Sequence, residues 1–122
     1  MEEVEVRLQA TVSASEFDEH YQMAFVYCMD KQRNYCFSLS RFPDEERIEV
    51  MVRDQLVCKV DDVWITLDGR TMEVALDSTI TARLDGESSY VIKLDTTDED
   101  LLGVHAALRR IFERKSGLRI VG

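Results

Sequence analysis

The side chains that could act as nucleophiles or metal ligands are few and widely spaced. The chain has three cysteines, Cys28, Cys36 and Cys58, and two histidines, His20 and His105. Nucleophilic catalysis needs a Ser, Cys or Thr beside a base. A structural zinc site needs Cys and His at short, regular spacings such as CxxC. Neither pattern is present, so these residues predict neither an enzyme nor a metal centre.

Other catalytic patterns are equally hard to find. Loops that cradle phosphate groups are rich in glycine, whereas the five glycines of this chain are isolated from one another. Paired carboxylates could act as acid and base in a hydrolase, but among 24 acidic residues no particular pair stands out. We therefore expect no cofactor and no catalytic activity. An enzyme that combines scattered carboxylates with His105 remains an alternative.

The cysteines indicate a reducing compartment. Small secreted domains carry even numbers of cysteine at high density, and this chain has three. Each lies in an apolar stretch, where a free thiol packs as a small hydrophobic group. One pairing stays open, because a hairpin that turns at residues 30–34 places Cys28 directly across from Cys36. The first residues carry no secretory signal, which also indicates the cytoplasm.

The charge of the chain bears on its partners. The formal net charge is −9 at pH 7. Nucleic acids are bound by Lys and Arg side chains that displace counterions, and anionic membranes attract the same residues. An acidic surface repels both, whereas it attracts and guides a basic protein. We therefore predict a protein partner, with neither nucleic acid nor membrane as a ligand, although acidity also serves solubility alone.

Apolar and polar residues alternate in a series of short segments, which is typical of β-strands with one wet face. Between two of these segments, Asp68–Gly69 predicts a type I′ hairpin, whose two central residues both need positive φ. In the segment 21–29 both faces are apolar, so this strand should be central or covered on both sides. The predicted strands cover residues 4–12, 21–29, 35–39, 48–52, 56–60, 63–67, 72–76, 80–84 and 90–94.

The C-terminal region predicts one amphipathic helix over residues 98–115. Thr96 and Glu99 match a capping box, and apolar side chains recur at helical spacing over residues 101–112. Such a helix buries its apolar face on a sheet. A chain of 122 residues has the size of one domain. The sequence therefore predicts a single α+β domain over residues 1–122, an antiparallel sheet of six to eight strands with one C-terminal helix on one face.

Two acidic segments are candidates for a protein interface. If the apolar residues of segment 63–67 face inward, Trp64 faces outward beside Asp61 and Asp62. An exposed tryptophan with a charged rim resembles a binding hot spot, unless the helix or the N-terminal strand covers it. The second candidate, for which a solvated turn is the alternative, is the acidic loop formed by Asp44, Glu45 and Glu46.

Several segments follow one another in a recognisable order. An Ile-x-Leu strand at residues 65–67 is followed by a strand at 72–76, an acidic linker at 98–100 and the helical stretch Ala-Leu-Arg-Arg-Ile-Phe at 107–112. From Tyr35 to Phe112 this order resembles a family of bacterial polymorphic-toxin immunity proteins, the tenth in the usual numbering. The resemblance implies a small cytosolic protein that binds and blocks a cognate toxin, without catalysis or cofactor.

Together these patterns predict a small cytoplasmic binding protein, an inhibitor of immunity type that occludes a basic toxin. A nuclease toxin fits the sign of the charge, because its substrate groove is basic and an acidic inhibitor can imitate the polyanion. Two non-catalytic alternatives remain, a dimeric secretion chaperone and a pleckstrin-like adaptor. The apolar segment 21–29 suits the groove of a chaperone homodimer, although burial within one monomer explains it equally well.

Overall fold

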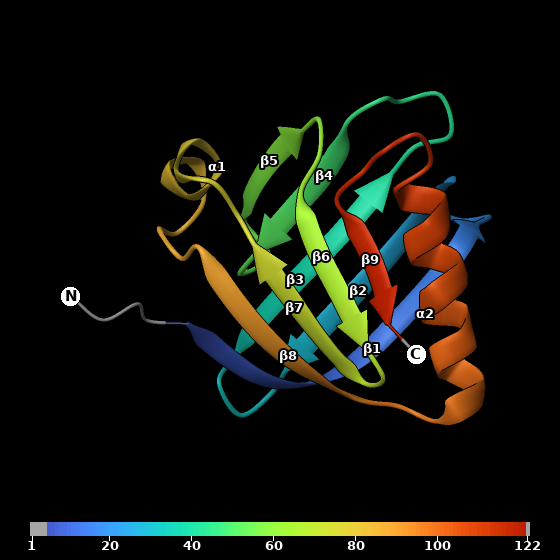
Figure 1. Ribbon diagram of the computed structural model, residues 1–122, viewed down its shortest axis with the longest axis horizontal. Coiled ribbons are helices and arrows are strands. Elements are labelled where there is room, and N and C mark those ends of the chain that lie inside the picture. The colour runs from blue at the N-terminus through green and yellow to red at the C-terminus, as the bar shows by residue number, and fades with distance from the viewer. Residues whose placement is uncertain (1–4, 122) are drawn as a thin grey trace.

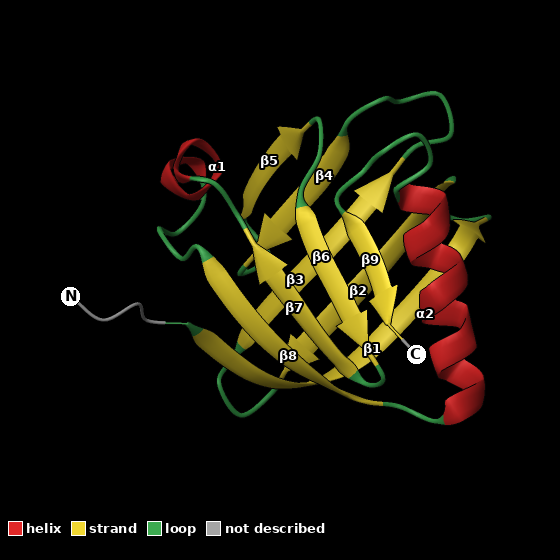
Figure 2. Cartoon of the chain, viewed as in Figure 1, coloured by secondary structure: helices red, strands yellow, loops and turns green. Residues whose placement is uncertain are grey.

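The computed structural model describes residues 5–121 as one β-sheet with two helices packed against it (Figures 1 and 2). The sheet order is β5-β4-β3-β2-β1-β8-β7-β6-β9. The helices are α1 (Ser78–Arg83) and α2 (Asp98–Ile111). The strands are β1 (Val6–Asp18), β2 (Met23–Asp30), β3 (Tyr35–Arg41), β4 (Ile48–Val52), β5 (Leu56–Val60), β6 (Trp64–Asp68), β7 (Thr71–Ala75), β8 (Ser89–Asp95) and β9 (Leu118–Val121).

The α+β class agrees with the prediction, whereas the sheet is larger and mixed. It has nine strands rather than six to eight. Within the described residues, β1 is parallel to β8 and β6 is parallel to β9, and all other pairs are antiparallel. An alternating sequence pattern gives no strand direction. The predicted all-antiparallel sheet is therefore wrong at these two pairs.

The sheet is strongly curled. β5 is first and β6 eighth in the sheet order, which in a flat sheet would separate them by about 34 Å. Only residues 61–63 join these two strands, and a connection this short spans at most about 14 Å. The sheet must therefore fold over itself. Figure 1 shows the result, with β6 and β7 crossing in front of β2 and β3.

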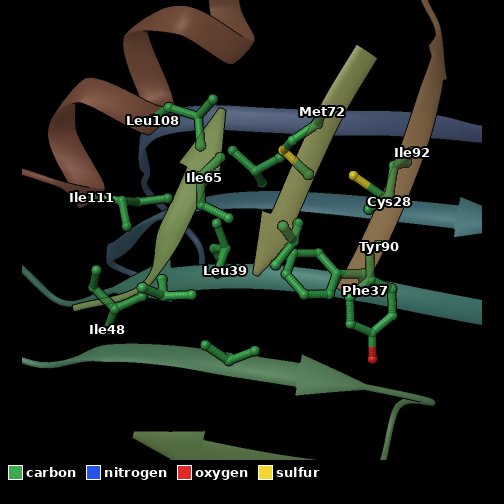
Figure 3. Packing of buried hydrophobic residues seen from close by; sticks show 14 of the residues in the cluster. Cys28, Phe37, Leu39, Ile48, Ile65, Met72, Tyr90, Ile92, Leu108 and Ile111 are labelled. Atoms are coloured by element: carbon green, nitrogen blue, oxygen red, sulfur yellow. The ribbon is translucent and has the colours of Figure 1, made fainter. Parts of the chain in front are cut away.

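The inner face of the folded sheet carries the core. In β6, Ile65 and Leu67 are fully buried while Trp64 and Asp68 are exposed, as the predicted alternation requires. Figure 3 shows side chains of β6 and β7 meeting those of β2 and β3, and α2 adds side chains from one end. The labelled core residues in that view are Cys28, Phe37, Leu39, Ile48, Ile65, Met72, Tyr90, Ile92, Leu108 and Ile111.

Helix α2 packs on β1 and β2, which confirms the predicted packing of the C-terminal helix on the sheet. Its N-cap is Thr97, one residue after the predicted Thr96, and the Thr97 hydroxyl accepts a hydrogen bond from the backbone N–H of Asp100 at 3.1 Å. The helix ends at Ile111 rather than at residue 115. Its buried side chains are Val104, Ala107, Leu108 and Ile111.

An arginine from the sheet closes the C-terminal end of α2. Arg41 Nη1 donates to the carbonyl oxygens of Ile111 and Glu113, each at 2.8 Å, and Arg41 Nε donates to that of Glu45 at 2.7 Å. The last carbonyls of a helix have no intrahelical partner, so the guanidinium satisfies them. The half-buried Arg41 thereby joins the β3–β4 loop to the end of α2.

The segment at 80–84 is helical, not the predicted strand. Asp77 is the N-cap of α1, and its Oδ1 accepts a hydrogen bond from the backbone N–H of Ile80 at 3.0 Å. Ile80 and Leu84 are both buried. They lie four residues apart, so the alternation that predicted a strand also fits one face of a helical turn. The N-cap decides between the two.

The β6–β7 turn lies one residue later than predicted. Asp68 pairs with Thr71, which makes Gly69 and Arg70 the central residues of the turn. Of these two, only Gly69 has positive φ, at 59°, so the turn is not type I′. Two further differences concern strand extent, because β1 continues to Asp18 and β9 follows α2.

Candidate functional site

The outer face of β2 carries a ridge of large side chains. Met23, Phe25, Tyr27 and Met29 alternate with buried residues and point away from the core. All four are half-buried. β2 lies between β1 and β3 and is the fourth of nine strands in the sheet order, which confirms that this strand is central. The alternating burial along β2 leaves its outer face partly open to solvent.

A row of serines turns this ridge into the wall of a groove. Ser38 and Ser40 of β3 lie directly opposite Tyr27 and Phe25. The next strand, β4, supplies the other wall. Small side chains between two rows of larger ones leave a hollow of about 450 Å³, which we call the outer groove. Its lining is completed by Ser13, Tyr21, Met23, Glu49 and Met51.

Tyr21 borders the outer groove, and the β1–β2 turn fixes its place. Asp18 Oδ1 accepts hydrogen bonds from the backbone N–H groups of His20 and Tyr21, both at 2.9 Å. Gln22 adopts a left-handed conformation with φ of 59° and returns the chain to β2. The Tyr21 ring stands edge-on to Phe25, with centroids 6.3 Å apart. Tyr21 is 57% exposed, so its ring projects into solvent.

A hydrogen bond anchors Tyr27. Its phenol donates to Asp54 Oδ1 at 3.1 Å, and the Cys36 thiol donates to the same oxygen at 3.2 Å. Burial, reinforced by Cys36 and Asp54, raises the pKa of Tyr27 to about 12. The phenol therefore stays protonated at neutral pH. Tyr27 is a fixed, uncharged wall of the groove and not an acid–base group.

Of the predicted interface residues Asp61, Asp62 and Trp64, two lie on the surface and one stabilises the fold. Trp64 is 68% exposed and Asp61 is exposed as well, so no described element covers them. Asp62 instead accepts hydrogen bonds from the backbone N–H groups of Ser116 and Gly117 at 3.0 and 3.2 Å. Burial opposes ionisation of Asp62, but these bonds outweigh it and lower the pKa of the carboxyl. Asp62 holds two loops together.

In the predicted acidic loop, two residues likewise face solvent and one is held by interactions within the protein. Asp44 and Glu46 are exposed, whereas Glu45 is half-buried. The Glu45 carboxylate accepts hydrogen bonds from the backbone and side chain of Arg47 at 3.1 and 3.3 Å, and Lys59 Nζ lies 3.8 Å away. The backbone bond from Arg47 is the main reason that the pKa of Glu45 is lowered. Glu45 therefore shapes the loop, and its two neighbours face solvent.

None of the six predicted interface residues lines the outer groove. Ile48 pairs with Val60, so the acidic loop before β4 and Asp61 after β5 leave the sheet at the same end. Trp64 begins β6, in the half of the sheet that folds over the other. The outer faces of these halves point in different directions. The groove and Trp64 are therefore separate surfaces.

The cysteines are buried free thiols. Cys28 lies opposite Phe37 and not opposite Cys36, because the register pairs Asp30 with Tyr35. The predicted facing pair is therefore wrong by one residue. Burial raises the pKa of the Cys28 thiol to about 12, and burial also raises the pKa of Cys36. A thiolate nucleophile is disfavoured at both positions.

The histidines join no cluster of potential metal ligands. His20 is exposed in the β1–β2 turn, and His105 is half-buried on α2. Over residues 5–121, no group of three or more His, Cys, Asp or Glu side chains is placed to hold a metal ion. In the same part of the chain, neither helix is long and apolar enough to cross a membrane.

A polar network that the sequence did not suggest joins the two halves of the sheet. The phenols of Tyr35 and Tyr90 lie 2.7 Å apart, and Tyr35 also donates to Asp85 at 2.7 Å. Arg53 Nε donates to the same carboxylate at 2.9 Å. Burial raises the pKa of Tyr35, while the bonds from Tyr35 and Arg53 outweigh burial and lower the pKa of Asp85. These groups satisfy one another, which favours a structural role.

A second hollow lies on the outer face of the parallel strands β1 and β8. Its two adjoining parts measure about 270 and 440 Å³. Asp30 is buried in its wall and accepts hydrogen bonds from the backbone N–H groups of Gln9 and Arg33. The other charged residues of the lining are Arg7, Lys31, Arg33, Lys93 and Asp95. Its cations outnumber its carboxylates, although Arg7 pairs with Glu5.

Comparisons of this chain with known protein families, with curated proteins and with solved structures find no match. The resemblance to the immunity-protein family therefore stays a prediction.

Proposed function

We propose that this protein is a non-catalytic binding protein that recognises a basic protein partner through the outer groove. The observation that carries the proposal is the lining of this hollow, in which the exposed Tyr21 and the half-buried Phe25 and Tyr27 all meet solvent. Exposed aromatic and methionine side chains in a hollow are typical of protein interfaces. The lining of the outer groove therefore favours a role in protein binding.

The character of the nucleophilic side chains supports binding over catalysis. The pKa values of Cys28 and Cys36 are raised, and both thiols are buried. The network around Asp85 is internally satisfied. The outer groove, whose lining is mainly apolar, has Glu49 as its one ionised side chain. These groups offer a surface for contact more readily than a reacting pair.

An immunity-type inhibitor is the specific form of this function that we favour. The net charge of −9 attracts a basic protein at long range, and Asp44, Glu46 and Asp61 add exposed carboxylates at one end of the sheet. A toxin that acts on nucleic acid carries a basic substrate groove, which an acidic protein can occlude. The partner in this form is a cognate toxin in the same cytoplasm.

The proposal is tested by capture from the source-cell lysate with three matched baits. The wild type, the groove variant Phe25→Thr and the control variant Leu102→Ser are immobilised at low salt. Leu102 is 67% exposed on α2 and outside the groove lining, so its replacement removes a comparable apolar contact elsewhere. We expect a basic protein on the wild type and the control, its loss from the groove variant, and its release as salt rises.

Toxicity of the captured protein, relieved when the wild type is expressed with it, identifies an immunity pair. Equal capture by all three baits would contradict the groove as the binding surface. Capture that resists salt would contradict the electrostatic part of the proposal.

Self-association through the same groove is the second candidate, and the half-buried ridge of β2 favours it. A dimer could bury the aromatic side chains between two copies, as in the chaperone alternative. Light scattering separates the two functions. A dimer that Phe25→Thr converts to a monomer supports the second candidate, whereas a wild-type monomer excludes it.

A further inference from the structure

The outer groove has aromatic walls of the kind that attract cations. The rings of Tyr21, Phe25 and Tyr27 all line the hollow. A cation over the face of such a ring is attracted by the ring quadrupole. The rings of Tyr21 and Phe25 stand at 84° to each other, so their faces point in different directions. A cationic group in the groove can therefore stack on the open face of a ring.

A carboxylate faces the same hollow. Glu49 of β4 is half-buried and lies beside Ser40 in the strand register. Its cross-strand neighbour is Lys59, but Lys59 forms its ion pair with Glu45 instead. Within residues 5–121, Glu49 forms no ion pair of its own. The groove therefore contains a negative charge that is available to a ligand.

We propose that the outer groove holds an arginine or lysine side chain of the partner, with its cationic head between the aromatic rings and Glu49. This inference rests on the proposed function and names the group that the groove recognises. Ser38 and Ser40 provide hydroxyl oxygens that accept hydrogen bonds from the N–H groups of the cation. The hollow of about 450 Å³ has room for an extended side chain and for apolar groups beside it.

The charge of the lining favours a cationic side chain over an anionic ligand and over a second copy of the chain. The lining includes no Lys, Arg or His, so an anionic ligand would meet Glu49 without a compensating cation. A second copy of the chain would bring its own net charge of −9 and would face Glu49 with a like charge. A cation on a basic partner is attracted both at long range and inside the groove.

The test is an NMR titration of the full chain labelled with ¹³C at the methionine methyl groups. Met23 and Met51 line the groove, and the fully buried Met72 serves as an internal control. The probes are N-acetyl-arginine methylamide and its neutral isostere N-acetyl-citrulline methylamide. We expect the arginine probe to shift Met23 and Met51 without shifting Met72. The citrulline probe should bind about tenfold more weakly.

Two conservative variants show whether the carboxylate acts as proposed. Glu49→Gln keeps the shape of the side chain and removes its charge, so the preference for arginine over citrulline should disappear. Glu46→Gln removes an exposed carboxylate outside the groove lining and should leave that preference unchanged. Equal binding of both probes to the wild type would overturn the inference. Probe shifts confined to other methyl groups would overturn it as well.

Failure of the cation site and failure of the proposed function give different results in these experiments. If Phe25→Thr abolishes capture of the partner but the probes do not discriminate by charge, the groove binds a protein without recognising a cation. If the arginine probe binds at the groove but all capture baits behave alike, the cation site is real and the proposed function is wrong.

Discussion

Replacement of Asp62 by alanine should destabilise the fold, although the sequence suggests an interface residue. The carboxylate accepts hydrogen bonds from the Val63 N–H, the Ser116 N–H, the Ser116 hydroxyl and the Gly117 N–H, at 2.9, 3.0, 3.1 and 3.2 Å. A hydrogen bond to a charged group contributes about 1.5–3 kcal/mol. Ser116 is exposed and its groups regain water when the carboxylate is removed, whereas Gly117 is buried. Counting the Gly117 bond in full and the others in part gives a loss of about 3 kcal/mol.

The measurement is chemical and thermal denaturation of the wild type, Asp62→Ala and Asp61→Ala. Asp61 is the exposed neighbour of Asp62, so its replacement removes the same charge without these bonds and should change stability by less than about 0.5 kcal/mol. The loss in Asp62→Ala should lower Tm by about 10 °C or more. The denaturant slope m should stay unchanged, because the surface exposed on unfolding is the same.

Equal stability of the two variants would refute this reasoning. It would mean that the Asp62 carboxylate does not hold the β5–β6 connection against the α2–β9 connection. A loss that is confined to partner binding, with wild-type stability, would return Asp62 to the interface.

Three further changes test other parts of the structure. Gly117→Ala should cost about 3 kcal/mol, because the added Cβ would lie 1.9 Å from the Val63 carbonyl oxygen. The Cβ of Gly103→Ala would meet nothing within 4 Å, so this variant should gain up to about 1 kcal/mol of stability. The denaturant midpoints of the two variants should therefore shift in opposite directions from that of the wild type. Arg41→Met should cost about 2 kcal/mol, because it leaves the last carbonyls of α2 without donors, and hydrogen exchange should quicken at the end of that helix. Stability should fall as the pH drops below about 5. Four carboxyls have a folded pKa below the unfolded value, so their contribution is complete above the unfolded pKa and is lost as the pH falls through the folded pKa. Asp62→Asn should reduce the dependence of stability on pH, measured by denaturation at each pH. These carboxyls belong to Asp30, Glu45, Asp62 and Asp85.

The parts of the fold that follow from side-chain alternation could be predicted from the sequence. In β6, Ile65 and Leu67 face inward and Trp64 faces outward, because a strand has a period of two. The C-terminal helix was equally clear, because its apolar residues have helical spacing and acidic residues follow Thr97 at its start.

Other parts depend on information that alternation does not contain. Ile80 and Leu84 fit a strand and a helical turn alike, and only the side-chain bond of Asp77 decides for α1. The register of β2 and β3 depends on the length of one turn, so an error of one residue placed Cys28 opposite Cys36 instead of Phe37. The parallel pairs form between distant segments, and no local pattern gives their direction.

The candidate site also combines features that a single strand predicts with features that depend on distant residues. The outward direction of Trp64 could be predicted from its own strand, whereas the role of Asp62 depends on residues 116–117, far along the chain. The outer groove was visible only in part. Residues 38–40 read Ser-Leu-Ser, which signals small side chains on one face of a strand. The hollow arises only when the sheet register brings Phe25 and Tyr27 beside them.

The most direct test of the central claim is the methionine-methyl spectrum of the protein in complex with the captured partner. Met23 and Met51 line the outer groove, Met29 extends the same ridge, and the core residue Met72 is shielded from any partner. We expect the signals of Met23 and Met51 to shift on binding while that of Met72 stays in place. A complex that forms with Met23 and Met51 unchanged would contradict the assignment of the groove as the binding surface.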